Sequence, residues 1–437
     1  MGNFNRSNLK KSFPLLADLV HWVKRRKNEL PSLFRHLTRR KLQRKQRSRR
    51  QEPIKVVFIC QYIPAWSKNK ALYETLARDP RFAPDLLCVP NRIHSNQLDD
   101  PTDLSNDAYD YFRTHGYPEA INALTGVNQW FDLKDLAPDY VIYNRYDRPM
   151  PLEYTSTIVS SFSKVCLIEY ATPLLRFEEQ QIDLRFTANT FCFFAESEAI
   201  RNSFLSWNRV LSKLHLSEAV CCGIPAVENA YLAKGSAARA WDFSSHSFRA
   251  IYAPRWTTDA VWGGSTFLRY KDFFLAFTDT HSELDLLVRP HPLMFQHFIA
   301  TGLMTEGELQ NFEEACSGRP NVRLDQEKEY LATFWNSSVL ICDFSSMIIE
   351  YYITQKPIIY LTYRKDIEYT AQMSEMLKGC YLVNNEQELG QTLEMLLAGE
   401  DPLASVRSEV CNKMLLQGSN VAASENMKQV LIDCYQK

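Results

Sequence analysis

The chain has 437 residues, of which 45% are hydrophobic and 23% are charged, and its formal net charge is -1. This length suits two domains of about 200 residues each rather than one core. No apolar run approaches the roughly 20 residues that cross a bilayer, so no membrane-spanning helix is expected. The eleven cysteines show no C-x-x-C pair and no Cys/His ligand spacing, which predicts reduced core thiols and no structural zinc.

The near-neutral net charge conceals a division between the first fifty residues and the rest. Residues 1–50 hold sixteen Lys and Arg against two acidic residues, which leaves the remainder with 34 basic and 49 acidic residues, a net charge of -15. Apolar residues recur at helical spacing over 13–23, and the segment 33–50 is still more basic. This pattern is typical of a cationic amphipathic helix.

We expect residues 1–52 to form a membrane-associating arm that contacts an anionic membrane surface through residues 10–50. No secretory signal is recognisable, which favours a cytoplasmic protein bound peripherally to the inner face of the cell membrane. Two alternatives stay open, namely a helix that packs on its own acidic body and a polybasic segment that binds nucleic acid. Phe13 and Trp22 favour lipid, so no nucleic-acid partner is expected.

The remainder of the chain alternates strand and helix patterns twice. In the first half, strand-like runs at 55–61, 85–90, 139–144, 164–170, 191–196 and 219–223 are separated by helical patterns such as 70–78, 153–162 and 198–207. In the second half, runs at 249–254, 285–290, 321–325, 339–343, 357–361 and 380–383 alternate with helices near 267–278, 306–316, 345–353 and 386–398. Each half predicts a parallel, doubly wound sheet, and the segments 234–238 and 244–247 form the expected linker.

We therefore expect an α/β protein of GT-B architecture with two Rossmann-like domains that face a cleft. Residues 53–240 form the expected N-terminal acceptor domain, and residues 241–437 form the expected C-terminal nucleotide-donor domain. No G-x-G-x-x-G follows the first strand-like run, which disfavours an NAD or FAD site.

Charged and hydroxyl-bearing residues follow the strand-like runs of the second half, where open α/β sheets bind ligands. A cation, an imidazole and two hydroxyls at the start of a helix can hold a diphosphate and assist transfer at phosphorus. Glu350 lies one turn, roughly 5 Å, beyond Ser346, which suits the ribose of the same nucleotide. The residues expected to bind the donor are Arg289, Arg255, Trp256, Asp343, Ser345, Ser346 and Glu350.

His291 lies between two prolines, which restrict its backbone and fix the aim of its ring. A histidine can donate to a phosphate oxygen or pass a proton to a leaving phosphate, so His291 is the first catalytic candidate. Simpler interpretations exist for these residues. Asp343 or Ser345 can be an N-cap with Glu350 solvated, His-Pro can be a structural turn, and Arg255 can form a surface salt bridge.

Together these segments resemble the CDP-glycerol glycerophosphotransferase family, the teichoic-acid primases and polymerases. The matching segments read IYAPRW at 251–256, VRPHP at 288–292, DFSS at 343–346 with Glu350, KPIIY at 356–360, and Asp366 with Tyr369. The resemblance implies a GT-B transferase that moves glycerol phosphate or ribitol phosphate from its CDP derivative to a hydroxyl of a lipid-linked or saccharide acceptor. No cofactor is expected, because the CDP-activated donor is a substrate, and no carboxylate cluster predicts a metal.

The chain departs from this family at one position. The family's W-H-G-T-P-L-K segment contains a histidine proposed as the base, whereas residues 169–175 read EYATPLL and Tyr170 stands at that position. Because tyrosine has an ordinary pKa of about 10, it is a poor base at neutral pH. The candidates for this role are Glu169, Asp147 and Tyr170. Two other functions stay open, namely a GT-B glycosyltransferase that uses a nucleotide sugar for capsule or lipopolysaccharide, and a non-catalytic membrane or nucleic-acid adaptor.

Overall fold

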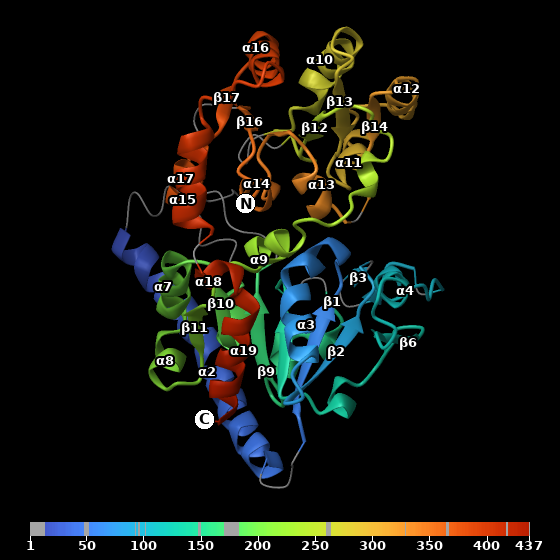
Figure 1. The fold of residues 1–437 in the computed structure, drawn as a ribbon. Coiled ribbons are helices and arrows are strands. Elements are labelled where there is room, and N and C mark those ends of the chain that lie inside the picture. Colours follow the sequence, from blue (N-terminus) through green and yellow to red (C-terminus); the bar gives the residue numbers. More distant parts are fainter. Residues whose placement is uncertain are drawn as a thin grey trace. The chain divides into compact units, whose positions relative to one another are not determined.

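The computed structural model describes residues 14–47, 52–91, 93–94, 97–100, 102–146, 150–169, 183–258, 264–327, 329–363, 367–416 and 418–436. The described residues form two compact units (Figure 1). Among the described residues, unit 1 comprises those up to 169, those of 183–225 and those from 422 onward, and unit 2 comprises those of 226–421. Each unit is built around one parallel sheet, as the strand and helix patterns predict.

The sheet of unit 1 has seven strands within the described residues, in the order β11-β10-β9-β8-β1-β2-β5. All neighbours pair in parallel. Because β1 pairs with β2 on one side and with β8 on the other, the chain winds outward in both directions. The strands are β1 (Ile54–Cys60), β2 (Phe82–Cys88), β5 (Ile121–Asn122), β8 (Tyr140–Tyr143), β9 (Lys164–Ile168), β10 (Thr190–Ala195) and β11 (Glu218–Cys221).

The sheet of unit 2 has six strands within the described residues, in the order β14-β13-β12-β15-β16-β17, and it is also parallel throughout. Two antiparallel hairpins, β3 (Ile93–His94) with β4 (Gln97–Leu98) and β6 (Leu124–Gly126) with β7 (Gln129–Trp130), belong to unit 1. The strands of the second sheet are β12 (Phe248–Ala253), β13 (Leu284–Val288), β14 (Val322–Leu324), β15 (Val339–Cys342), β16 (Ile358–Leu361) and β17 (Tyr381–Val383).

Helices connect the strands in both units. In unit 1 they are α2 (Pro14–Arg47), α3 (Lys70–Ala77), α4 (Asp107–Thr114), α5 (Ser156–Val159), α6 (Leu184–Asn189), α7 (Glu198–Trp207), α8 (Arg209–Lys213) and α19 (Ala423–Gln436). The division between the units falls at the start of α9 (Pro225–Leu232). In unit 2 they are α10 (Phe267–Thr280), α11 (Met294–Ala300), α12 (Glu306–Ser317), α13 (Leu331–Trp335), α14 (Met347–Tyr352), α15 (Ala371–Leu377), α16 (Glu386–Leu397), α17 (Ala404–Met414) and α18 (Gly418–Val421).

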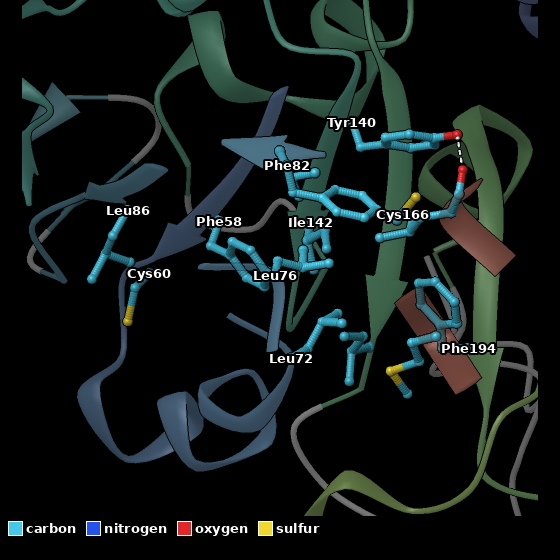
Figure 2. Close-up of a cluster of buried hydrophobic side chains, with 14 of the residues drawn as sticks. Phe58, Cys60, Leu72, Leu76, Phe82, Leu86, Tyr140, Ile142, Cys166 and Phe194 are labelled. Atoms are coloured by element: carbon cyan, nitrogen blue, oxygen red, sulfur yellow. Dashed lines mark hydrogen bonds between the residues drawn. The ribbon is translucent and has the colours of Figure 1, made fainter. Parts of the chain in front are cut away.

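Both faces of each sheet are buried, which explains why the strands read as nearly continuous apolar runs. In β1, Phe58 and Cys60 enter one core cluster, while Val57 and Ile59 enter the cluster on the other face. Figure 2 shows Phe58 beside Ile142 in the first of these clusters. The eleven cysteines, all of which lie in described parts of the chain, are free thiols, as expected.

The C-terminal helix α19 belongs to unit 1, whereas the sequence places it in the second domain. Its residues Met427 and Leu431 join the core cluster of the first sheet. The hydroxyl of Tyr140 donates to the carbonyl oxygen of Leu431 at 2.8 Å, and Lys164 Nζ donates to that of Cys434 at 2.6 Å. The units also divide at residues 225 and 226 rather than at the expected linker near 240.

The basic arm is one continuous helix, α2, which contains Pro31. One face of α2 packs on unit 1 through polar groups. Ser32 Oγ and Arg35 Nη2 both donate to Asn189 Oδ1 at 2.7 Å, and a ring nitrogen of His36 lies 2.9 Å from the carbonyl oxygen of Ala188. Burial, followed by the charge of Arg39, lowers the pKa of His36 to about 3. The polar face of α2 therefore agrees with the alternative given above, a helix that packs on the rest of its own chain.

The remaining surface of α2 carries apolar side chains in solvent. Val23, Leu30, Phe34 and Leu37 are exposed, at spacings of seven, four and three residues that put them on one side of a helix. Phe13 lies outside the described residues. Among the helices in the described part of the chain, none is long and apolar enough to cross a membrane.

Candidate active site

The residues expected to bind the donor follow three neighbouring strands of the second sheet. Arg255 and Trp256 follow β12, Arg289 and His291 follow β13, and residues 343–346 follow β15. Strands β13 and β15 both pair with β12, so these segments meet at the carboxyl edge of the sheet. Backbone hydrogen bonds continue the pairing, since the N–H of Arg289 donates to the carbonyl oxygen of Tyr252 at 2.7 Å.

The buried carboxylate of Asp343 joins two segments of the site by hydrogen bonds. Its carboxylate accepts from the N–H of Arg255 at 2.9 Å, and from the N–H and hydroxyl of Thr266 at 2.9 and 3.0 Å. Burial raises the pKa of Asp343 to about 6 against the opposing effect of these donors. With its oxygens engaged in this way, Asp343 positions the loop that carries Arg255 and the start of α10.

Arg255, Trp256, Phe344 and His291 form one cluster at this edge. The guanidinium of Arg255 lies 5.0 Å from the centre of the Phe344 ring, and the rings of Trp256 and His291 are 5.9 Å apart. His291 Nδ1 accepts from the N–H of Leu293 at 3.2 Å, so the ring proton of neutral His291 lies on Nε2. Burial, followed by the charge of Arg255, lowers the pKa of His291 to about 4. The neutral ring can therefore donate through Nε2.

Arg289 and Glu350 belong to a second cluster. Arg289 forms a salt bridge with Asp325 and donates to the carbonyl oxygen of Glu327 at 2.6 Å. Its guanidinium lies 4.8 Å from the centre of the Tyr330 ring, and the Tyr330 hydroxyl donates to Glu350 Oε2 at 2.8 Å. A diphosphate that binds Arg289 would therefore share the guanidinium with the carboxylate of Asp325.

The two serines precede α14, which begins at Met347 rather than at the expected residue 345. Ser345 Oγ accepts from the N–H of Met347 at 3.3 Å, and this contact leaves the Ser345 hydroxyl hydrogen available to an anion. Ser346 is exposed and makes no side-chain hydrogen bond to the start of the helix. Both hydroxyls therefore lie at the same sheet edge as Arg255.

The candidate bases follow strands of the first sheet. Asp147 and Tyr170 lie outside the described residues. Glu169 directly follows β9, and Tyr146 donates to its Oε1 at 3.3 Å. Burial, followed by the charge of Glu196, raises the pKa of Glu169 to about 7. The sequence interpretation missed Glu196 and Tyr146 as site residues, although Glu196 is the last residue of the strand-like run 191–196 and directly follows β10.

The described architecture is similar to solved structures along most of the chain. The wall teichoic acid polymerase TagF is 13% identical, covers 94% of this chain and 98% of its own, and superposes with a TM-score of 0.56. UDP-GlcNAc 2-epimerase from Neisseria meningitidis, bound to UDP-GlcNAc, is 13% identical, covers 87% of this chain and 100% of its own, and has a TM-score of 0.58. At these identities the likeness concerns the fold. Among curated protein sequences, none matches the chain.

The two parallel sheets and their likeness to these structures define a GT-B-like fold. Residues 236–404 match the model of the family described as CDP-Glycerol:Poly(glycerophosphate) glycerophosphotransferase. This segment lies in the second unit, which is similar to this family of transferases. The matched segment contains every residue expected to bind the donor, together with His291.

Proposed function

We propose that the chain transfers a polyol phosphate, either glycerol phosphate or ribitol phosphate, from a CDP-activated donor to a hydroxyl of a membrane-linked or saccharide acceptor. The product is a teichoic-acid-like or capsule-like polymer of the bacterial envelope. The observation that carries this proposal is the grouping of Arg255, His291 and Ser345 at one sheet edge, within the segment that matches the family.

On the donor side, Arg255 and the hydroxyls of Ser345 and Ser346 bind the phosphates. His291 donates through Nε2 to the oxygen that leaves with CMP. Because the guanidinium and the imidazole are held by packing against Phe344 and Trp256, little reorganisation is needed when charge develops. Glu350 contacts the ribose, and Arg289 supports the Tyr330 ring that holds Glu350.

On the acceptor side, Glu169 takes the proton of the attacking hydroxyl. A carboxyl group whose pKa is about 7 is half ionised at neutral pH. Its carboxylate is a stronger base than the carboxylate of an ordinary glutamate. Glu169 thus offers the basicity that the family's histidine would supply.

Helix α2 holds unit 1 at an anionic membrane surface. Its exposed residues Leu30, Phe34 and Leu37 enter the acyl region, while Lys27 and Lys41 on the same side meet lipid headgroups. The polar face of α2 stays packed on unit 1 through Asn189.

The nucleotide product tests the proposed reaction. Purified protein is incubated with CDP-glycerol, CDP-ribitol or UDP-GlcNAc and a lipid-linked acceptor, and the released nucleotide is identified. Transfer at phosphorus releases CMP, whereas transfer of a sugar releases a nucleoside diphosphate. Arg255→Ala should abolish release, and Arg323→Ala is the control, because Arg323 stacks on Phe243 outside the site. Release of UDP alone would favour the second candidate, a sugar transferase. A nucleotide sugar, UDP-GlcNAc, is the molecule bound in the similar structure of UDP-GlcNAc 2-epimerase.

A further inference from the structure

Three adjacent strands of the first sheet are followed by residues that can accept or donate a proton. Strands β8, β9 and β10 are neighbours, and Ile168 of β9 lies opposite Phe194 of β10. Glu169 therefore lies one residue beyond Ile168, and Glu196 lies two residues beyond Phe194. Tyr146 follows β8 by the same edge.

The contacts of Glu169 are specific. Tyr146 donates to Glu169 Oε1 at 3.3 Å, and its ring packs edge-on against Phe186 at 5.4 Å. Burial, followed by the charge of Glu169, raises the pKa of Tyr146, so the phenol stays a donor at neutral pH. Of the charged groups that act on Glu169, Glu196 has the largest effect, and it raises the pKa of Glu169.

Buried amides at the same edge point to a polar ligand. Asn144 directly follows β8, and Gln61 directly follows β1, the next strand along. Asn144 is 2% exposed and Gln61 is 1% exposed, and within the described residues neither Asn144 Nδ2 nor Gln61 Oε1 has a hydrogen-bond partner. A buried donor and a buried acceptor without partners are costly, and both would be satisfied by hydroxyl groups.

We propose that Glu169 and Glu196 act as one carboxyl pair that shares a single proton, in which Glu169 takes the proton of the acceptor hydroxyl and Glu196 and Tyr146 are positioning residues. This inference rests on the proposed function. The acceptor oxygen forms a bond to the phosphorus of the glycerol phosphate, and its proton moves to Glu169. The bond from that phosphorus to the bridging oxygen breaks, and its electron pair leaves with CMP.

The two positioning residues act on Glu169 in opposite directions. A second carboxylate nearby disfavours ionisation, so Glu196 raises the pKa of Glu169, whereas the hydrogen bond from Tyr146 favours the ionised form and lowers it. Asp183, at the start of α6, is the other charged group that acts on Tyr146 within the described residues. Two carboxyl groups that interact in this way titrate as a pair rather than as single groups.

The pH profile of kcat/KM for CDP-glycerol transfer tests the pair. Glu169→Gln should lose at least about 100-fold in rate. Glu196→Gln should move the acid limb of the profile at least about one pH unit lower, whereas Tyr146→Phe should move it higher. Glu196→Asp should restore the limb toward the wild-type position. A Glu196→Gln profile that falls equally at all pH values, with its limb unmoved, would show a merely structural residue and overturn the inference.

A second measurement separates this inference from the proposed function. Infrared difference spectra between pH 5 and pH 9 detect a protonated carboxyl group without turnover. The wild type should show a carboxyl band that titrates near pH 7, distinct from the band of Asp343 near pH 6. The band near pH 7 should be absent in Glu169→Gln and shifted to lower pH in Glu196→Gln. If the band behaves so while no CDP-polyol is consumed, the pair stands and the proposed substrate is wrong. If glycerol phosphate is transferred while no such band titrates, the pair is refuted.

Discussion

Replacing Phe34 by glutamate should detach the protein from anionic membranes. Val23, Leu30, Phe34 and Leu37 are 50%, 55%, 69% and 47% exposed. Because full burial of such a side chain contributes about 1.5–3 kcal/mol, inserting these half-exposed residues should contribute roughly 1 kcal/mol each, and about 2 kcal/mol for Phe34. Basic residues near the headgroups add about 1 kcal/mol each.

Phe34→Glu removes the largest of these apolar contributions and adds a charge that anionic lipids repel. A loss of about 2 kcal/mol lowers the partition coefficient roughly 30-fold. The assay is cosedimentation of the full chain with sucrose-loaded vesicles that contain 30 mol% phosphatidylglycerol. Leu382→Glu is the matched control, because Leu382 is 51% exposed but belongs to β17 in unit 2. Equal binding by wild type, Phe34→Glu and Leu382→Glu would refute the assignment of this surface to lipid.

Three further predictions concern the site and the packing of unit 1. His291→Ala should abolish transfer and leave the fold intact. His297→Ala, which alters the other imidazole beside Trp256, should keep a turnover close to that of the wild type. A turnover of His291→Ala above about a tenth of wild type would refute the catalytic role. His36 is buried with a pKa lowered to about 3, so below about pH 6.5 the unfolded chain binds a proton that the folded chain does not, and stability falls as the pH drops, by about 1.4 kcal/mol per unit from this group. Urea midpoints at pH 7.5 and pH 5 should therefore differ more for wild type than for His36→Gln, and equal differences would count against this linkage. Lys164→Met should destabilise unit 1 by about 2–3 kcal/mol, because it leaves the carbonyl oxygen of Cys434 without this donor, and an unchanged urea midpoint would contradict this.

The central strands of both sheets could be predicted from the sequence because each is buried on two faces. The predicted runs 55–61 and 339–343 are apolar over 56–60 and 339–342, and they match β1 and β15 to within one residue at each end. Short elements could not be found in this way. Strand β5 has two residues, and α6 and α8 have six and five, too few for a periodic pattern to emerge.

The position of the C-terminal helix follows from contacts that sequence distance conceals. Its residues Leu431 and Cys434 meet Tyr140 and Lys164, which precede them by 291 and 270 positions. A local sequence pattern can indicate a helix, but it does not indicate which sheet the helix covers. The division of the chain into units therefore depends on this packing rather than on composition near residue 240.

At the candidate site, the sequence indicated which residues follow neighbouring strands but not what each one contacts. Strand ends bring Arg255, His291 and Ser345 to one edge, which is a matter of topology. Arg289 differs because Asp325, which follows β14 on the next strand, engages its guanidinium. Such a pairing depends on which strand lies at the edge, and no spacing in the sequence reveals it.

Helix α2 shows why a helical apolar pattern alone does not decide which side of a helix is buried. The hydrophobic stripe of a surface helix ordinarily faces the core, yet in α2 the buried side carries Ser32, His36 and Arg39, while Phe34 and Leu37 face solvent. Burying that polar side is tolerable because Asn189 and the carbonyl oxygen of Ala188 satisfy it. Hydrogen bonds to a fixed body orient the helix, so the apolar stripe is left to contact something other than the protein's own core. This division of roles is what the membrane proposal requires, and it could not be deduced before the partners of the polar side were known.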